Sequence, residues 1–571
     1  MQGSPSLRGT LQFTSPASPI SLALRMRFPL LCTSLFVAAS FAGQATAQLQ
    51  PPPEPAANPS TPEKIVLGKI LFWDEQLSSN DTVACGTCHI PAFSFTDNRE
   101  FIHPGPDGIE GTLDDSITSP GVVRTDHNKK FLISPEFGLR QQLTDRRTND
   151  IFGSAYQARI FWDGRAGDEF LNPETGAVSI ATGGALESQA IGPILNPVEM
   201  GHEGRDWDDV IAKLEGSTPL RIATDIPADM ANAIALDPTY PELFETAFST
   251  PVITVERIAF AIAAYERSLV PDQTPYDDYM RGVPGAMTPE QIDGMNQFLG
   301  IANCHLCHTP PIFSDGDFHN NGMRPVVWDN GLQGTTQDVN DRGKFKTPSL
   351  RNAGLRTSFY HNGFFQQLWP QGVSNIYWGG GGGFLDNRDP LLTPLSAVPG
   401  INLEHIFKDF VGEALTDPRV ANETYPFDRP TLFSDRQPFT ANLYGESNPG
   451  PTGVNPKITA HMPAIIGQDF QVAVSQGLGG AMAHFGGSSR PGSGLMRGGR
   501  LINIGLPFDQ IFSLPLFGNG PVGGWRALTV SIPTSPNLIG RNYYLQWWVE
   551  DPGAVGGVAS ATQGAVIEIL P

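Results

Sequence analysis

Two short segments of the chain repeat one arrangement of cysteine and histidine, Cys-x-x-Cys-His, at residues 85–89 and at residues 304–308. The chain has five cysteines, and only Cys32 lies outside these two segments. At this cysteine and histidine content, one such segment would arise by chance in roughly one chain in a thousand. Two of them in a single chain therefore indicate a shared chemistry, in which two thiols and one imidazole act together.

The spacing is typical of the covalent attachment of a c-type haem. The two thiols add to the vinyl groups of one porphyrin, and the imidazole of the next residue binds the iron. We therefore predict two covalent haems with these attachment cysteines and proximal histidines: Cys85, Cys88 and His89 for the first haem, and Cys304, Cys307 and His308 for the second.

Zinc sites and disulfide bonds are the alternatives for the same residues. Zinc also binds cysteine and histidine, but each segment would supply only three of the four ligands that a structural zinc site needs. Two disulfides would suit an exported protein, but they would leave both histidines without a role. Haem attachment accounts for every cysteine and histidine that recurs in the two segments.

Helical patterns lie before the second segment. Residues 253–270 carry apolar side chains at helical spacing. Residues 288–291 read Thr-Pro-Glu-Gln, which is typical of a helix start with an N-cap threonine, a proline in the first turn and a capping-box glutamine. This helix leads into the second haem segment. Because the chain also contains 62 glycines and 51 prolines, we expect helical haem domains with long loops.

The pattern changes near residue 450, where residues 448–453 read as a linker. Three β-rich runs follow at residues 527–533, 542–549 and 564–570, separated by turn residues. Short strands at this spacing favour a β-sandwich-like domain of unknown role.

A chain of 571 residues is too long for one ordinary domain. We predict a mainly α protein with two c-type-cytochrome-like helical haem domains, followed by an all-β, sandwich-like domain. The expected divisions are these: an upstream extension and signal peptide at 1–47, the first haem domain at 48–250, the second at 251–447, and the β domain at 455–571.

The N-terminal region predicts export. From Met26 a basic start is followed by a short apolar run, and Ala45-Thr46-Ala47 precedes Gln48 as a cleavage signal. We expect a periplasmic protein, cleaved between Ala47 and Gln48, without a transmembrane segment after cleavage; a membrane anchor is the alternative. The net charge of −21 argues against nucleic-acid partners and permits a partner with a basic docking face.

A polar stretch follows the first haem segment. Within it, residues 105–115 place acidic side chains between glycines, an arrangement that could bind calcium. The spacing differs from that of an EF-hand, and a solvated loop is the alternative. Calcium is therefore a possible cofactor.

Further strings along residues 60–440 carry a resemblance. In order, they are residues 67–72, 93–97, 161–165, 189–193, 196–200, 265–269, 313–316 and 346–352. Together with the two haem segments, they resemble the bacterial dihaem cytochrome c peroxidases, a family that includes the MauG-like branch. The resemblance implies that the first haem reacts with peroxide and that the second passes electrons.

The resemblance also implies roles for four side chains around the first haem. Glu199 is similar to the distal glutamate of the family, which moves protons on the bound peroxide. Gln189 resembles the hydrogen-bonding partner of that glutamate, and Pro193 the proline that crowds the open face of the iron. Trp162 resembles the tryptophan between the two haems. Without the resemblance, a lone glutamate or tryptophan would be read as a turn or core residue.

The sixth ligand of the second haem departs from the common pattern. Many family members use a methionine, but the chain has none between Met323 and Met462. The MauG-like branch uses a tyrosine after a His-x-Gly turn, which is here at residues 361–363. The resemblance therefore points to Tyr377, with a buried core tyrosine as the alternative. A phenolate ligand would stabilise oxidised iron.

The first haem raises a second question. Many relatives carry a histidine that caps the reactive iron, and the loop that follows the first segment offers His103 and His127. Neither lies in a matching string, so the iron is either permanently open or capped by a histidine that the sequence does not identify.

We therefore predict a periplasmic dihaem peroxidase that reduces hydrogen peroxide at the first haem and relays electrons through the second. A small redox protein, either a cytochrome c or a cupredoxin, would supply the electrons. A MauG-like enzyme that oxidises a side chain of a partner protein is one alternative. A non-catalytic electron-transfer cytochrome and a dioxygen-using relative are the others.

Overall fold

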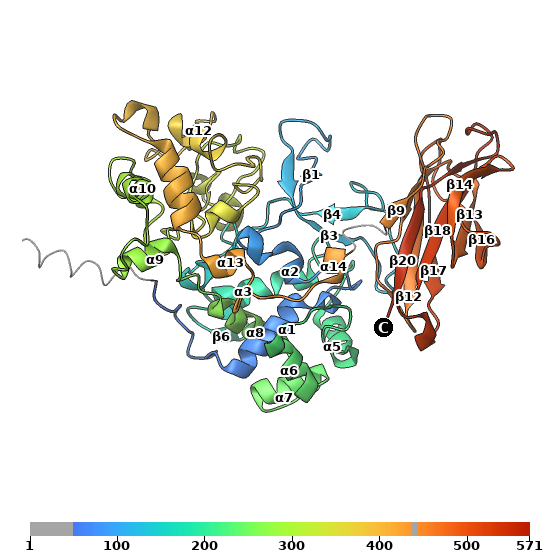
Figure 1. The fold of residues 1–571 in the computed structure, drawn as a ribbon, viewed down its shortest axis with the longest axis horizontal. Coiled ribbons are helices and arrows are strands. Elements are labelled where there is room, and N and C mark those ends of the chain that lie inside the picture. Colours follow the sequence, from blue (N-terminus) through green and yellow to red (C-terminus); the bar gives the residue numbers. More distant parts are fainter. Residues whose placement is uncertain (1–48, 437–441) are drawn as a thin grey trace, which may run out of the picture. The chain divides into compact units, whose positions relative to one another are not determined.

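The computed structural model describes residues 49–436 and 442–571. Helices and long loops form the part that carries both Cys-x-x-Cys-His segments, and a β-rich region follows it (Figure 1). The predicted signal peptide, with its cleavage site and Cys32, lies outside the described residues. No helix of the described residues is both long enough and apolar enough to cross a membrane.

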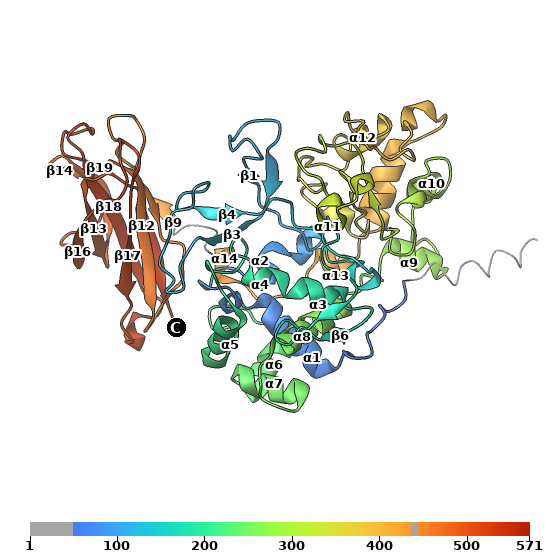
Figure 2. The ribbon, with the colours of Figure 1, turned by 180° about the vertical axis from the view of Figure 1, so that it is seen from behind.

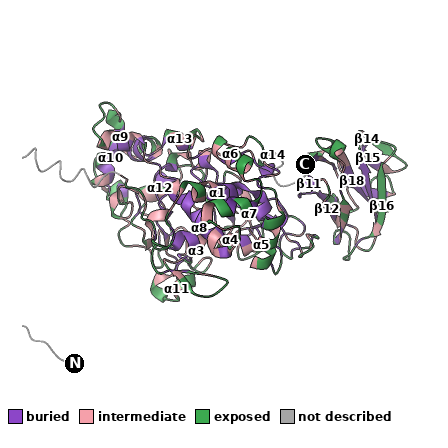
Figure 3. Cartoon of the chain, turned by 90° about the horizontal axis from the view of Figure 1, so that it is seen from below, coloured by how far each residue is buried: buried purple, intermediate pink, exposed green. Residues whose placement is uncertain are grey.

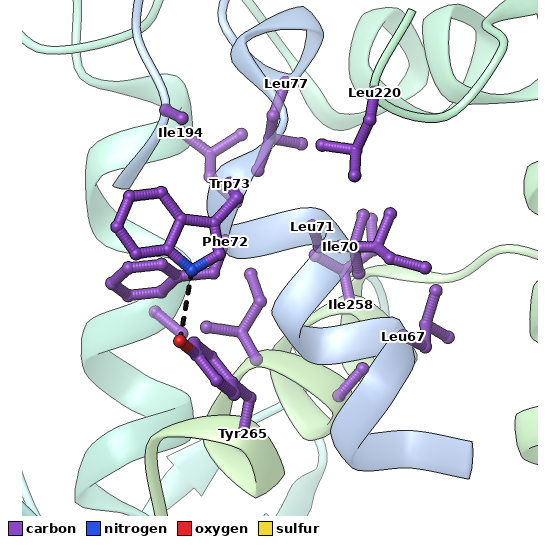
Figure 4. Packing of buried hydrophobic residues seen from close by; sticks show 14 of the residues in the cluster. Leu67, Ile70, Leu71, Phe72, Trp73, Leu77, Ile194, Leu220, Ile258 and Tyr265 are labelled. Carbon is purple, nitrogen blue, oxygen red and sulfur yellow. Dashed lines mark hydrogen bonds between the residues drawn. The ribbon is translucent and has the colours of Figure 1, made fainter. Parts of the chain in front are cut away.

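The first core is built on two helices, α1 (Pro62–Trp73) and α8 (Val255–Ser268), which pack along each other. Gly68 permits their close approach, because a Cβ atom there would lie 1.8 Å from the carbonyl oxygen of Ala261. Figure 4 shows the apolar side chains between the helices and the bond from Trp73 Nε1 to Tyr265 Oη, 3.1 Å long. This core adjoins the first haem segment.

Helix α8 differs from its predicted assignment. Residues 253–270 were predicted to belong to the second haem domain, and the helix itself forms there, beginning after the N-cap Thr254. Most of its side chains, however, are buried, with Ile258, Ala261, Ile262 and Tyr265 in the first core, and α1 and α3 pack against it. The predicted boundary at residue 250 therefore separates a helix from the core to which it belongs.

Shorter elements complete the first haem region. The helices are α2 (Cys85–Cys88), α3 (Ala185–Ala190), α4 (Gly192–Leu195), α5 (Trp207–Gly216), α6 (Ala228–Leu236) and α7 (Tyr240–Phe248). Three antiparallel strand pairs are β1 (Phe101–His103) with β2 (Ser116–Thr118), β3 (Pro120–Val123) with β4 (Gln141–Leu143), and β5 (Phe170–Leu171) with β6 (Val178–Ile180).

The second core surrounds α10 (Pro289–Leu299) and a π-helical segment (Glu404–Ala414) that packs on it. Thr288 and Gln291 form the predicted capping box at the start of α10. The remaining elements are α9 (Pro275–Met280), α11 (Gln333–Thr336), α12 (Val373–Trp378), α13 (Pro418–Ala421), α14 (Phe433–Arg436) and the strand pair β7 (Phe318–His319) and β8 (Phe345–Lys346). Figure 3 shows how the buried residues are distributed along both haem regions.

The C-terminal region consists of antiparallel sheets (Figure 2). A three-stranded sheet has the order β10 (Lys457–Thr459), β12 (Asp469–Gly477), β17 (Gly524–Ser531). A larger sheet has the order β11 (Ala464–Ile465), β20 (Gly564–Leu570), β18 (Asn542–Glu550), β13 (Met482–Ser488), β16 (Gln510–Pro515). In addition, β9 (Asn442–Tyr444) pairs with β20, and β19 (Ala559–Ala561) pairs with β18. Strands β14 (Pro491–Arg497) and β15 (Arg500–Ile504) form a hairpin. Strands β11 and β20 pair in parallel.

The three predicted strands correspond to β17, β18 and β20, so the predicted β-rich C-terminal region is confirmed. Its start differs, because β9 pairs with β20 ahead of the predicted boundary at residue 455. The apolar core of this region also takes in Val123 from β3, and Phe131 and Leu139 from the loop between β3 and β4. Thr459 Oγ1 donates to the carbonyl oxygen of Leu139 at 3.1 Å. The β3–β4 segment of the first haem region is therefore part of the core of the β region.

Candidate active site

The two Cys-x-x-Cys-His segments hold their histidines in the same way. His89 Nδ1 lies 2.9 Å from the carbonyl oxygen of Phe95, and His308 Nδ1 lies 3.1 Å from that of Phe313. With Nδ1 bonded to a backbone carbonyl, Nε2 is the ring nitrogen that remains for a metal. This second bond fixes the orientation of each imidazole, as in proximal iron ligands.

Backbone strain accompanies both bonds. Phe95 has φ of 52° and Phe313 has φ of 55°, values in the left-handed region that bulky side chains rarely adopt. Both phenylalanine rings are fully buried in their cores. The apolar packing therefore holds a turn that directs the carbonyl oxygen at the histidine.

The protonation of the two histidines suits metal binding. Burial lowers the pKa of His89, and it lowers the pKa of His308 to about 4. Both imidazoles are therefore neutral near pH 7, which is the form that binds iron. The four cysteines of the segments are free thiols, so the disulfide alternative does not hold in this structure.

A first cavity brings together the residues that the sequence analysis assigned to the reactive haem. Its lining includes the attachment residues, the four side chains implied by the resemblance and one further carboxyl: Cys85, Cys88, His89, Trp162, Gln189, Pro193, Glu199 and Glu266. Residues more than a hundred positions apart therefore meet around one space. This is the arrangement that the haem assignment requires.

Glu199 is held by the loop in which it lies. Asn196 Nδ2 donates to Glu199 Oε1 at 3.0 Å, and the backbone N–H of Val198 donates to Asn196 Oδ1. Strands β3 and β4 fix the same loop from outside, because Val122 N–H donates to the Val198 carbonyl and Gln142 Nε2 donates to the Pro197 carbonyl. Burial raises the pKa of Glu199, which favours a carboxyl that can both accept and release a proton.

Gln189 and Pro193 come from the adjacent helices α3 and α4. The buried carboxylate of Glu187 braces α3, since Arg267 Nη2 on α8 donates to both of its oxygens at 2.7 Å. Gln189 lies two residues after this ion pair. The pair therefore ties the helix that carries Gln189 to the first core.

A second cavity surrounds the other segment. Its lining includes Cys304, Cys307, His308 and Tyr377, and also Tyr360 and His361, whose positions in the cavity the sequence did not reveal. Tyr377 lies on α12, with its ring stacked on Phe407 at a centroid distance of 5.9 Å. Burial raises the pKa of both tyrosines. Tyr360 Oη is buried and has no hydrogen-bond partner within the described residues.

Trp162 and Arg147 line both cavities. The two residues are joined by a bond of 2.8 Å from Trp162 Nε1 to the carbonyl oxygen of Arg147. The Trp162 ring also meets the ring of His361 edge to face, at a centroid distance of 6.4 Å. An aromatic side chain therefore lies where the two cavities adjoin, as the resemblance implied.

The two histidines considered as caps lie elsewhere. His103 is in β1, where its Nε2 is 3.6 Å from Asp145 and 3.7 Å from Glu136. His127 is exposed beside Asn128. Neither residue belongs to the lining of the first cavity.

Two features bear on other metals. In the acidic loop, Asp107 N–H donates to Asp114, and Gly111 N–H donates to Asp115, so loop amides bind these carboxylates. Calcium stays a prediction for this loop.

Among the described residues, the only group of histidine, cysteine and acidic donors within ligating distance of one another is Cys307, Asp315 and His319. Because it contains a haem-attachment cysteine, it does not support a separate metal site.

Sequence reasoning missed Glu266 and Tyr360. Glu266 lies within a matching string, but nothing in that string says which face of α8 meets the haem cavity. Tyr360 directly precedes the His-x-Gly turn, and its φ of 69° turns the chain there.

The residues that line each cavity fit a covalently bound haem. Each cavity is lined by two free thiols and by one neutral imidazole whose Nε2 is available for iron.

Comparison with known proteins agrees with this geometry. A family profile described as di-haem cytochrome c peroxidase matches residues 62–284. The methylamine utilization protein MauG of Paracoccus denitrificans (strain Pd 1222) is 31% identical over 342 residues, which cover 55% of this chain and 74% of that protein. Cytochrome-c peroxidase IdrP1 of Pseudomonas sp. (strain SCT) is 28% identical over 458 residues, which cover 73% of this chain and 98% of that protein.

Among solved structures, a MauG-like protein associated with microbial copper homeostasis aligns with a TM-score of 0.47 and 24% identity, covering 68% of this chain and 97% of that chain. The profile match extends from helix α1 to α9, and family membership implies two haems. The chain belongs to the di-haem cytochrome c peroxidase family.

Proposed function

We propose that this protein reduces hydrogen peroxide at the haem held by His89, with electrons relayed through the haem held by His308. The observation that carries this proposal is the meeting of Glu199 and Gln189 with the first haem segment around one cavity. The second cavity has tyrosines among its lining residues instead. Each haem would be attached covalently through the two thiols of its segment. When bound, the first haem supplies an iron that polarises the O–O bond of peroxide.

Glu199 would do the proton chemistry. Cleavage of peroxide removes a proton from one oxygen and delivers a proton to the other, and a single carboxyl near both oxygens can do both. The bond from Asn196 orients this carboxyl, and burial keeps its pKa above the usual range. Gln189 would hold the peroxide by a hydrogen bond, and Pro193 would limit the space for competing ligands.

Trp162 would carry electrons between the cavities, since it lines both of them. Tyr377 would be the sixth ligand of the second haem. Its phenol is neutral in the isolated pocket, and binding to ferric iron would remove its proton. A phenolate favours the oxidised state of iron, so the second haem should be hard to reduce.

The tyrosine gives a specific reason to retain a second candidate function. A haem that resists reduction suits an enzyme that uses peroxide to oxidise a side chain of a partner protein, as in the MauG-like alternative. A reduced cytochrome c or cupredoxin would be the electron donor of the plain peroxidase. In both cases we propose a periplasmic protein with two haem domains and a C-terminal β domain.

Two measurements test the proposal on the holo-protein with both haems attached. Steady-state reduction of peroxide by reduced cytochrome c supports the plain peroxidase. The spin states of the two irons separate the alternatives: one high-spin iron in the oxidised protein supports an open reactive site. Two low-spin irons that persist on half-reduction, without peroxide turnover, contradict the proposal and support an electron-transfer cytochrome.

A further inference from the structure

A second buried glutamate lines the first cavity. Glu266 lies on α8, one turn after Ile262, and both residues contribute to the lining. The side chain is only 8% exposed. Its Oε2 atom is buried and has no hydrogen-bond partner within the described residues. A buried carboxyl oxygen without a partner is costly to maintain, so it calls for a role.

Glu266 differs from the other carboxyls of this cavity. Asp150 and Asp163 each form an ion pair with an arginine, at 3.0 Å and 2.6 Å. The side chain of Asp145 is 95% exposed. Glu199 accepts the bond from Asn196. Asp150 Oδ1 is also buried without a hydrogen-bond partner, but its Oδ2 is paired with Arg356, whereas Glu266 has neither a partner for Oε2 nor an ion pair within the described residues.

The charged groups around Glu266 do not neutralise it. Arg267 is the cation whose charge lowers the pKa of Glu266, but its Nη2 donates to both oxygens of Glu187 on α3. Lys64 on α1 is bonded to Asn58 and to a backbone carbonyl instead. Burial is the largest influence on Glu266, and it raises the pKa of the carboxyl to about 8, with Arg267 opposing and Glu187 adding to the shift. The carboxyl is therefore mainly protonated at pH 7.

We propose that Glu266 is a proton donor of the first cavity, which supplies protons to peroxide as it is reduced. This inference rests on the proposed peroxidase function. Reduction consumes two electrons and two protons per peroxide: the O–O bond breaks, two O–H bonds form and two waters leave. Glu199 can only transfer a proton that peroxide already carries. The two further protons must enter from solvent, and the electrons come from a reduced one-electron donor protein.

A line of hydrogen-bonded polar side chains runs from Arg267, the residue after Glu266, toward the surface. Arg267 contacts Glu187, and Asn58 Nδ2 donates to Glu187 Oε1 at 2.8 Å. Lys64 Nζ, which lies nearer the surface, donates to Asn58 Oδ1 at 3.3 Å. After releasing a proton to the cavity, Glu266 would regain one from solvent along this side of α8.

The test compares Glu266→Gln with Glu245→Gln in the holo-protein. Glutamine keeps the size of the side chain but cannot donate an acidic proton, and Glu245 is an exposed glutamate on α7. We expect the rate constant for peroxide reduction to fall about tenfold to a hundredfold in Glu266→Gln and to stay unchanged in Glu245→Gln. In the wild type this rate constant should decrease as pH rises through about 8, because the donor loses its proton; Glu266→Gln should lack this decrease.

A second readout does not depend on activity. The infrared difference spectrum between the oxidised and reduced wild-type protein should show a protonated carboxyl band that shifts in heavy water. This band should be absent from Glu266→Gln and retained in Glu245→Gln. Glu266→Asp, which restores a carboxyl, should recover part of the lost rate if the fold is intact.

Two results would overturn the assignment. One is a Glu266→Gln protein, with both haems incorporated, that keeps the wild-type rate constant and pH profile. The other is an infrared difference spectrum in which Glu266→Gln retains every protonated carboxyl band of the wild type. A wild-type protein that fails to reduce peroxide would instead overturn the proposed function, and the infrared comparison would still report whether Glu266 holds the proton.

Discussion

The two haem cavities share the way they hold a histidine and differ in the groups that face it. In each, a backbone carbonyl from a strained phenylalanine turn binds Nδ1 of the proximal histidine. The first cavity then presents Glu199 and Glu266, whereas the second presents Tyr360 and Tyr377. Under the proposed function, the attachment segment specifies a haem, and lining residues from distant parts of the chain set its reactivity.

Among the variants that test this comparison, Glu199→Gln should have the largest effect on the rate of peroxide reduction. The variant keeps the bond to Asn196 possible but removes the proton carrier, so the rate constant for peroxide reduction should fall by about 10²–10⁴-fold. Stopped-flow mixing of the oxidised holo-protein with peroxide measures it. Glu203→Gln, four residues later and exposed, is the matched control and should react like the wild type. If Glu199→Gln reacted with peroxide at the wild-type rate, the functional difference proposed for the two cavities would be wrong.

A buried ion pair lies in the second haem region, and breaking it should affect stability. Arg351 binds both oxygens of Asp277 at 2.8 Å and also donates to the carbonyl of Pro311, three residues after His308. Arg351→Met leaves a buried carboxylate without its cation, with only the bonds from Thr274, and should cost about 3–5 kcal/mol in the free energy of unfolding. The surface pair of Arg281 with Asp278 is the control, and Arg281→Met should cost about 1 kcal/mol or less. Chemical denaturation of the holo-proteins measures both.

The same pair predicts a pH dependence. Burial alone would raise the pKa of Asp277, but the bonds from Arg351 outweigh burial and hold that pKa below its usual value. The stabilisation is therefore present above the pKa of the unfolded chain and is lost as the pH falls through the lower, folded value. Arg351→Met should lose less stability than the wild type as the pH falls from neutral through the folded pKa of Asp277, by roughly the contribution of this one carboxyl. Equal acid sensitivity of both proteins would contradict this account.

Tyr377→Phe tests the ligand proposed for the haem of the second cavity. Removing the phenol should change the absorption and raise the midpoint potential of the second haem, because a phenolate stabilises ferric iron. The first haem should keep its spectrum. Tyr360→Phe is the informative partner variant, since Tyr360 lines the same cavity. If Tyr360→Phe produced the change and Tyr377→Phe did not, Tyr360 would be the ligand.

Trp162→Phe should have the smallest effect, and that effect should be limited to electron transfer between the two haems. The variant retains an aromatic ring but loses the bond to the Arg147 carbonyl. We expect slower oxidation of the second haem after peroxide reacts at the first, with both haem spectra unchanged. Trp328→Phe, in a residue that lines neither cavity, should leave this rate unchanged. An identical rate in both variants would exclude Trp162 from the electron path.

Local signals in the sequence were reliable because their causes are local. The start of α10 follows from Thr288 and Gln291, which cap the helix themselves. The haem segments are likewise complete within five residues. Glu199 and Gln189 could be named only because their strings resemble a known family, and no spacing rule places them in one cavity.

The features that sequence reasoning missed depend on distant contacts. Helix α8 joins the first core because Gly68 lets α1 approach it, and neither helix encodes that partner by itself. The same packing turns Glu266 toward the haem cavity. The first strand of the β region, β9, has three residues, and its strand character comes from pairing with β20 at the far end of the chain.

The packing of the β3–β4 segment into the core of the β region sets a minimum length for the working enzyme. Val123, Phe131 and Leu139 are buried in a core whose other members lie beyond residue 455. Strand β4, which ends this segment, also holds the Glu199 loop through the bond from Gln142 to Pro197. A chain shortened before residue 442 would therefore keep both Cys-x-x-Cys-His segments but lose packing that supports the Glu199 loop. We expect such a chain to attach both haems and to reduce peroxide poorly.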